Sequence, residues 1–125
     1  MKVIYNSVIP FKGYKAVNVF GVIFVRKGST MDVTDFNHEA IHTAQMDDFV
    51  MGFPWLRIIG GIIFYVIYVI EFVIRLIQYL GWKEAYRNIS FEREAFANEN
   101  DTEYLDNRRQ YAWADYINTE WEDEE

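Results

Sequence analysis

The stretch N-H-E-A-I-H-T-A-Q, residues 37–45, contains His38 and His42, the only two histidines of the chain, with Glu39 between them. On a helix, residues four positions apart lie on one face about one turn apart, so both imidazoles can reach a single metal ion. Glu39 can then hold a water molecule bound to that ion. The spacing therefore predicts a metal-binding helix around which the chain folds.

The composition restricts the size of the fold and the chemistry of its ligands. A chain of 125 residues suits one domain, 1–125, with a single core. The chain has no cysteine, so a metal would be held by imidazole and carboxylate groups, which also serve catalytic zinc. The net charge of −7 argues against a nucleic-acid partner, which requires clustered Lys and Arg.

The first residues do not have the apolar core of a signal peptide, because Pro10 and Lys12 interrupt it. We therefore expect a cytoplasmic or membrane-associated protein. Residues 1–30 are predicted to form a β region, since β-branched and aromatic side chains dominate it. It would contain a short strand or arm and then a firm strand near Ala16 to Arg26.

The metal-binding helix is predicted over residues 34–51. Asp32 or Thr34 provides its N-cap, and Gly52 and Pro54 end it. Both histidines lie in the middle of the stripe that is predicted to face inward. The residues of that face are Thr34, His38, Ile41, His42, Gln45 and Phe49.

Residues 55–80 are the most apolar part of the chain and are predicted to form one long helix. Their uninterrupted apolar run is shorter than the roughly 18 to 20 residues that a membrane-spanning helix needs. One face carries the polar residues together with two aromatic ones: Phe64, Tyr68, Glu71, Arg75 and Gln78. Because the other faces are almost wholly apolar, the helix either forms the core, completed by a partner in a homo-oligomer, or contacts a membrane.

Residues 84–119 are predicted to form two further helices. The first, a third-ligand helix, ends near Asn100, and Asp101 or Thr102 can cap the second. Residues 120–125 form an acidic tail. The expected fold class is α+β, mostly α, with a short N-terminal β region followed by about four helices.

A catalytic zinc site needs three protein ligands, and the third must be Asp or Glu because no other histidine or cysteine remains. The downstream candidates are Glu71, Glu84, Glu92, Glu94 and Glu99. Periodicity favours Glu92, which shares an apolar face with Ile89 and Phe96. Glu94 instead shares its face with Arg87 and other polar residues. The predicted metal ligands are therefore His38, His42 and Glu92.

A carboxylate on an apolar face needs a partner that offsets its desolvation. A divalent cation is such a partner for Glu92, and a salt bridge to Arg75 or Arg108 is the alternative. Glu71 is explained more simply as the partner of Arg75, four residues later on the same helix.

The pairing of H-E-A-I-H with a later F-E-R-E-A-F-A resembles the gluzincin clan of metallopeptidases, including the minigluzincins. In that clan the metal helix is followed by a helix with a Glu ligand in an E-x-x-A setting, which Glu92 and Ala95 match. The resemblance covers about residues 34–99. Many relatives have Asp or Asn directly after that Ala, where this chain has Phe96. Shifting the motif by two residues would make Glu94 the ligand, so both registers stay open.

The resemblance implies a minimal zincin-like fold and zinc-dependent hydrolysis of a peptide or protein substrate. Glu39 would act as general base, and a strand beside the metal helix would bind the peptide by strand addition. A Tyr or Arg would stabilise the oxyanion, and the sequence offers Tyr86, Tyr111, Arg108 and Arg109. The alternative function is a non-catalytic metal-binding, membrane-associated or interaction module with a zincin-like fold.

Overall fold

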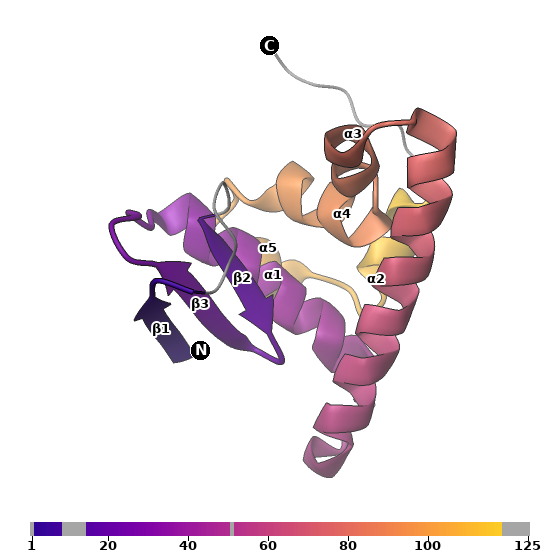
Figure 1. The fold of residues 1–125 in the computed structure, drawn as a ribbon. Helices are drawn as coiled ribbons and strands as arrows, with labels where there is room; N and C mark the ends of the chain where they lie inside the picture. The colour runs from indigo at the N-terminus through magenta and orange to yellow at the C-terminus, as the bar shows by residue number, and fades with distance from the viewer. Residues whose placement is uncertain (1, 9–14, 51, 119–125) are drawn as a thin grey trace.

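The computed structural model of the chain describes residues 2–8, 15–50 and 52–118. A three-stranded sheet lies on one side of helix α1, and the long helix α2 lies on the other side of the molecule (Figure 1). The elements are β1 (Lys2–Asn6), β2 (Ala16–Val19), β3 (Val22–Arg26), α1 (Val33–Asp48), η1 (Pro54–Leu56), α2 (Arg57–Tyr79), α3 (Trp82–Arg87), α4 (Ser90–Asn98), α5 (Tyr104–Asn107) and η2 (Ala112–Tyr116). The predicted fold class, α+β and mostly α, is confirmed.

The sheet has the order β1-β3-β2, with β1 parallel and β2 antiparallel to β3. The single firm strand predicted from Ala16 to Arg26 is wrong, because the chain reverses at Phe20 and Gly21, both of which have positive φ. The backbone N–H of Phe20 donates to the Tyr65 hydroxyl at 3.0 Å, and that of Gly21 donates to Asn18 Oδ1 at 2.8 Å. A contact with α2 therefore fixes a turn that the local sequence, an unbroken β-like run, does not indicate.

Helix α1 begins as predicted at the N-cap Asp32, one of the two proposed caps. The Asp32 carboxylate accepts from the backbone N–H of Asp35 at 2.8 Å, and the Asp35 carboxylate accepts from that of Asp32 at 3.0 Å. This reciprocal pair satisfies two helix N–H groups. The helix ends at Asp48, before the predicted end at residue 51, which lies outside the described residues. Its buried face carries His38, Ile41, His42, Gln45, Met46 and Asp48.

Helix α2 packs its predicted polar and aromatic face inward. Its buried residues include Gly60, Gly61, Phe64 and Arg75. A Cβ on Gly61 would lie 2.4 Å from the ring of Phe20, so the glycine permits the close approach of α2 to the β2–β3 turn. Phe64 belongs to the core cluster with Met46, Ile89 and Phe91, which joins α2 to α1 and α4.

The third-ligand helix, predicted as one element from residue 84 to about Asn100, is divided into α3 and α4. Glu71 of α2 accepts from the backbone N–H of Ser90 at 2.8 Å and from its hydroxyl at 2.5 Å, which starts α4. Glu71 also pairs with Arg75 at 3.2 Å, as predicted.

The predicted C-terminal helix is likewise wrong as a continuous element, since α5 and η2 are separate. Between them Arg108 turns inward to Asp48 and Glu94, and Tyr111 has a positive φ of 60°. The predicted acidic tail, 120–125, lies outside the described residues.

Candidate metal centre

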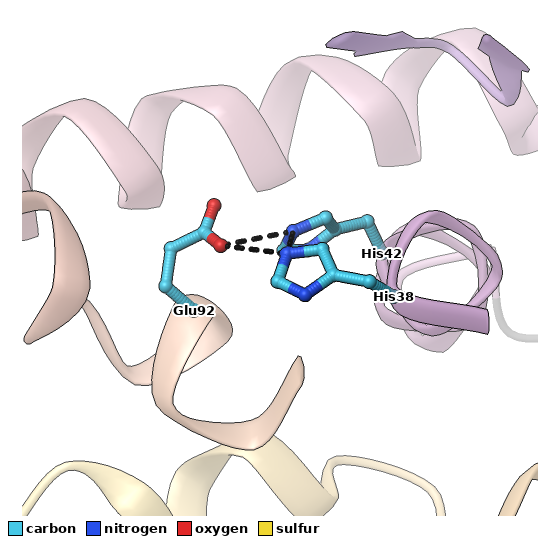
Figure 2. A group of neighbouring side chains, drawn as sticks. All are labelled: His38, His42 and Glu92. Carbon is cyan, nitrogen blue, oxygen red and sulfur yellow. Dashed lines mark hydrogen bonds and ion pairs between the residues drawn. The ribbon is translucent and has the colours of Figure 1, made fainter. Parts of the chain in front are cut away.

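His38 and His42 of α1 point toward Glu92 of α4, so that three ligand atoms meet at one point (Figure 2). Glu92 Oε1 lies 3.1 Å from His38 Nε2 and 3.2 Å from His42 Nε2, and the two Nε2 atoms are 3.2 Å apart. All three side chains are buried. The group could hold a metal ion.

The spacing of the three atoms fits a tetrahedral site. With metal–ligand bonds of about 2.1 Å, neighbouring ligand atoms of a tetrahedron are about 3.4 Å apart. The three observed separations, 3.1, 3.2 and 3.2 Å, are within a few tenths of an ångström of that value. A small outward movement of the side chains would therefore admit an ion without rearrangement of the helices.

The Nδ1 atoms of both histidines are also hydrogen-bonded. His38 Nδ1 lies 2.7 Å from Glu99 Oε2, and His42 Nδ1 lies 2.8 Å from Gln45 Oε1. The Gln45 amide is oriented because its nitrogen donates to the Phe91 carbonyl at 2.8 Å and to a carboxylate oxygen of Glu94 at 3.0 Å. Since both Nδ1 partners are acceptors, each Nδ1 carries a hydrogen. Each Nε2 is then the nitrogen available to a metal, the arrangement that outer hydrogen bonds impose on histidine ligands.

Charge interactions within the cluster shift the pKa values of His38 and Glu92 in opposite directions. Burial lowers the pKa of His38, but hydrogen bonds to Glu92 and Glu99 outweigh it and raise that pKa to about 10. Burial alone would raise the pKa of Glu92, yet the positive charge on His42 and the hydrogen bond from His38 lower it. The imidazolium of His38 and the ionised carboxylate of Glu92 therefore attract one another across the cluster.

Tyr68 of α2 holds the other oxygen of the Glu92 carboxylate. Its hydroxyl donates to Glu92 Oε2 at 2.7 Å, which leaves Oε1 directed at the histidines. The ring of Tyr68 stacks on that of Phe91, with centroids 6.2 Å apart and planes 9° apart. No motif in the sequence marks Tyr68 as part of the site, and its place on the polar face predicted for 55–80 is the one signal for it.

A cavity of about 330 Å³ opens beside the cluster. Its walls come from β2, α1, α2 and the α3–α4 region: Ala16, Val17, Asn18, Glu39, His42, Met46, Phe64, Tyr65, Tyr68, Tyr86 and Glu92. Glu39 therefore shares the cavity with two of the three candidate ligands. Burial raises its pKa, an effect that the charges of His42 and His38 partly oppose.

The structure brings Glu92, and not Glu94, to the histidines. Glu94 is fully buried, which corrects its assignment to a polar face. Its carboxylate accepts from Arg108 at 2.5 Å and from the Tyr104 hydroxyl at 2.6 Å. Asp48 is the second partner of Arg108, at 2.8 Å. The predicted alternative of a Glu92 salt bridge to Arg75 or Arg108 is wrong, because these arginines pair with other carboxylates.

Not all of the other residues considered from the sequence lie at the cavity. Tyr86 lines the cavity, whereas Arg109 pairs with Asp115 at the exposed surface. Tyr111 packs on Phe49, with ring centroids 5.8 Å apart. Glu99, predicted only as a candidate ligand, is instead the hydrogen-bond partner of the candidate ligand His38.

Comparisons of the chain with protein family models, with characterised proteins and with solved structures give no match.

Proposed function

We propose that this chain is a small zinc-dependent metallopeptidase of gluzincin type. The observation that supports the proposal best is the convergence of His38, His42 and Glu92 at 3.1–3.2 Å, with Glu39 beside them on the wall of one cavity. Two imidazoles and one carboxylate with an open position are a ligand set of catalytic zinc.

Zinc bound to this set would lower the pKa of a coordinated water molecule and polarise a peptide carbonyl. The Glu39 carboxylate accepts the proton of the attacking water and returns it to the leaving amine as the C–N bond breaks. Burial raises the pKa of Glu39, which makes its carboxylate a stronger base than an exposed one. Of the four oxyanion candidates taken from the sequence, Tyr86 is the one that lines the cavity, and it would donate to the carbonyl oxygen.

The substrate would be an extended peptide that adds to the sheet at β2. In the order β1-β3-β2, strand β2 is paired within the described sheet only to β3, and its Ala16, Val17 and Asn18 line the cavity. Main-chain hydrogen bonds to such an edge bind a peptide independently of its sequence. Met46 and Phe64 form an apolar part of the cavity, which favours an apolar substrate side chain.

The test is peptide hydrolysis by zinc-loaded protein, with an internally quenched peptide library as substrate. Glu39→Gln should retain about one equivalent of zinc and lose roughly 10²- to 10⁴-fold in rate, the usual contribution of a general base. Glu103→Gln makes the same change at an exposed position and should keep both properties.

Full hydrolysis by Glu39→Gln with zinc bound would show that the base is assigned wrongly. Stoichiometric zinc without hydrolysis of any library peptide by the parent protein would instead favour the alternative, a non-catalytic metal-binding module.

A further inference from the structure

The outward face of α2 is a continuous apolar surface. Every exposed residue between positions 58 and 77 of this helix is Ile or Val: Ile58, Ile59, Ile62, Ile63, Val66, Val69, Ile70, Val73, Ile74 and Ile77. Monomeric soluble proteins rarely expose apolar surface of this extent. Of the described helices, Pro54–Tyr79 is long and apolar enough to cross a membrane by length and composition.

The packing of α2 argues against a crossing. Its opposite face contacts the rest of the protein along its length, from Gly60 and Gly61 near its start, through Tyr68, to Arg75 near its end. In Figure 1 the sheet, α1 and α4 lie beside α2 and not beyond one of its ends. A spanning α2 would therefore draw charged groups packed beside its middle to hydrocarbon depth, such as Glu39, which lines one cavity with Phe64 and Tyr68.

Both ends of the apolar face carry an exposed tryptophan. Trp55 is 75% exposed and Trp82 is 71% exposed. Indole rings favour the level of lipid headgroups. A cation lies close to each in sequence: Lys83, which is exposed, and Arg57, whose side chain stays 66% exposed although Asp47 is 3.9 Å away. These cations can reach headgroup phosphates.

We propose that α2 lies in the plane of a membrane surface, with its Ile and Val side chains inserted among the acyl chains. Interfacial helices bury such a face about 5–10 Å deep. A protein partner is disfavoured because protein–protein interfaces carry about one hydrogen bond per 100–200 Å², and this face offers no polar side chain between positions 58 and 77. Because the net charge of the chain is −7, anionic lipids do not attract it. Insertion of the apolar side chains therefore provides the free energy of membrane binding.

This orientation sets the depth of the candidate metal centre. Phe64, Tyr65 and Tyr68, which line the cavity, lie on the inward side of the same helix that meets the lipid. The cavity is then separated from the acyl chains by about one helix diameter, roughly 10–12 Å.

The first experiment measures flotation of the full chain with vesicles of zwitterionic phosphatidylcholine at low and high salt. The parent protein should float equally well at both. The triple variant Ile62→Ser, Val66→Ser, Val69→Ser should bind about tenfold less for each residue changed, since half-burying such a side chain in hydrocarbon stabilises binding by about 1.4 kcal/mol.

The matched control removes three exposed apolar side chains away from α2: Tyr5→Ser, Val8→Ser and Val33→Ser. It should float like the parent. Equal flotation of the two triple variants, or no flotation of the parent, overturns the proposal. If the parent protein forms dimers without binding vesicles, and the α2 triple variant is monomeric, the apolar face binds a second copy of the chain. That result also overturns the proposal.

The second experiment distinguishes a helix in the plane from one that crosses. The chain has no cysteine, so Ile59→Cys, Val66→Cys and Val73→Cys can each carry one dye. These positions share the outward face and span about 21 Å along the helix axis. Quenching by lipids labelled at known depths should give similar depths for all three. A middle position much deeper than the outer two shows a crossing helix and overturns the proposal.

Discussion

Glu92→Gln and Glu94→Gln form a matched pair that separates the two registers of the third ligand. Both substitutions exchange a carboxylate for an amide on α4, and both side chains are buried, at 3% and 0% exposure. Only Glu92 lies within 3.2 Å of both histidine Nε2 atoms. We therefore expect Glu92→Gln to weaken zinc binding and Glu94→Gln to leave it nearly unchanged.

The size of the effect follows from linkage. At free zinc a thousandfold above its Kd, binding stabilises the folded state by about 4.1 kcal/mol. For a chain of 125 residues the entropy of unfolding near its Tm is about 0.26 kcal/mol per kelvin, so zinc should raise Tm by about 16 °C. If loss of the Glu92 carboxylate weakens binding about a hundredfold, the same zinc stabilises Glu92→Gln by about 1.4 kcal/mol, or about 5 °C.

Glu94→Gln should show the opposite pattern. Its metal-free Tm should fall, because Arg108 loses one of its two buried carboxylate partners and keeps only Asp48. Its zinc-induced rise in Tm should stay near that of the parent, since a glutamine oxygen can still accept from Gln45. The assay is thermal unfolding followed by circular dichroism, with zinc buffered by a chelator. A zinc shift that survives in Glu92→Gln and disappears in Glu94→Gln would refute the assignment of Glu92.

Three further outcomes are expected for the same candidate metal centre. Glu99→Gln should lower zinc affinity by about 10- to 100-fold, because it weakens the acceptor that orients His38, and chelator competition measures this loss. Zinc affinity should also rise with pH, by up to about tenfold per unit above neutrality, since zinc must displace the proton that His38 holds with a pKa of about 10. The stability of the metal-free protein should move the other way, as the contribution of protonated His38 is complete below its ordinary pKa of 6.5 and is lost as pH rises through about 10. Affinity independent of pH, or a Glu99→Gln protein with parental affinity, would contradict the geometry proposed for His38.

Features coded by neighbouring residues were predictable from the sequence. The Asp32 cap and the helical spacing of His38 and His42 act over one or two turns, so the sequence predicts helix α1 and offers its N-cap, Asp32, as one of two candidates. The inward placement of Glu92 followed from its apolar neighbours on the same face, and the structure confirms that this side chain is buried.

Features fixed by distant contacts were not predictable in the same way. The turn at Phe20 depends on Tyr65, and the start of α4 depends on Glu71, both on the long helix. Glu94 has polar neighbours along α4, but Arg108 provides a charged partner in the interior that no local pattern reveals. A buried ion pair and an exposed polar face therefore look alike in a single sequence.

Burial of His38, His42 and Glu92 together costs free energy of desolvation. Core packing alone does not explain why the chain keeps this cluster. Three ionisable side chains meet in the interior, next to an apolar cluster that includes Phe64 and Phe91. Replacing such a buried polar group with apolar residues of similar volume is often neutral or stabilising, so stability is a weak reason to keep it. A bound cation removes the cost, since it satisfies both Nε2 lone pairs and the carboxylate at once.

The outer hydrogen bonds strengthen this argument for a metal. Glu99 and Gln45 each hold an Nδ1 hydrogen, and Tyr68 holds the second carboxylate oxygen, so every ligand is oriented by a group on its far side. A histidine pair retained only for packing would not require both rings to direct Nε2 at one carboxylate oxygen. Metal centres require this orientation, because ligand geometry must be fixed before the ion binds if affinity is to be high.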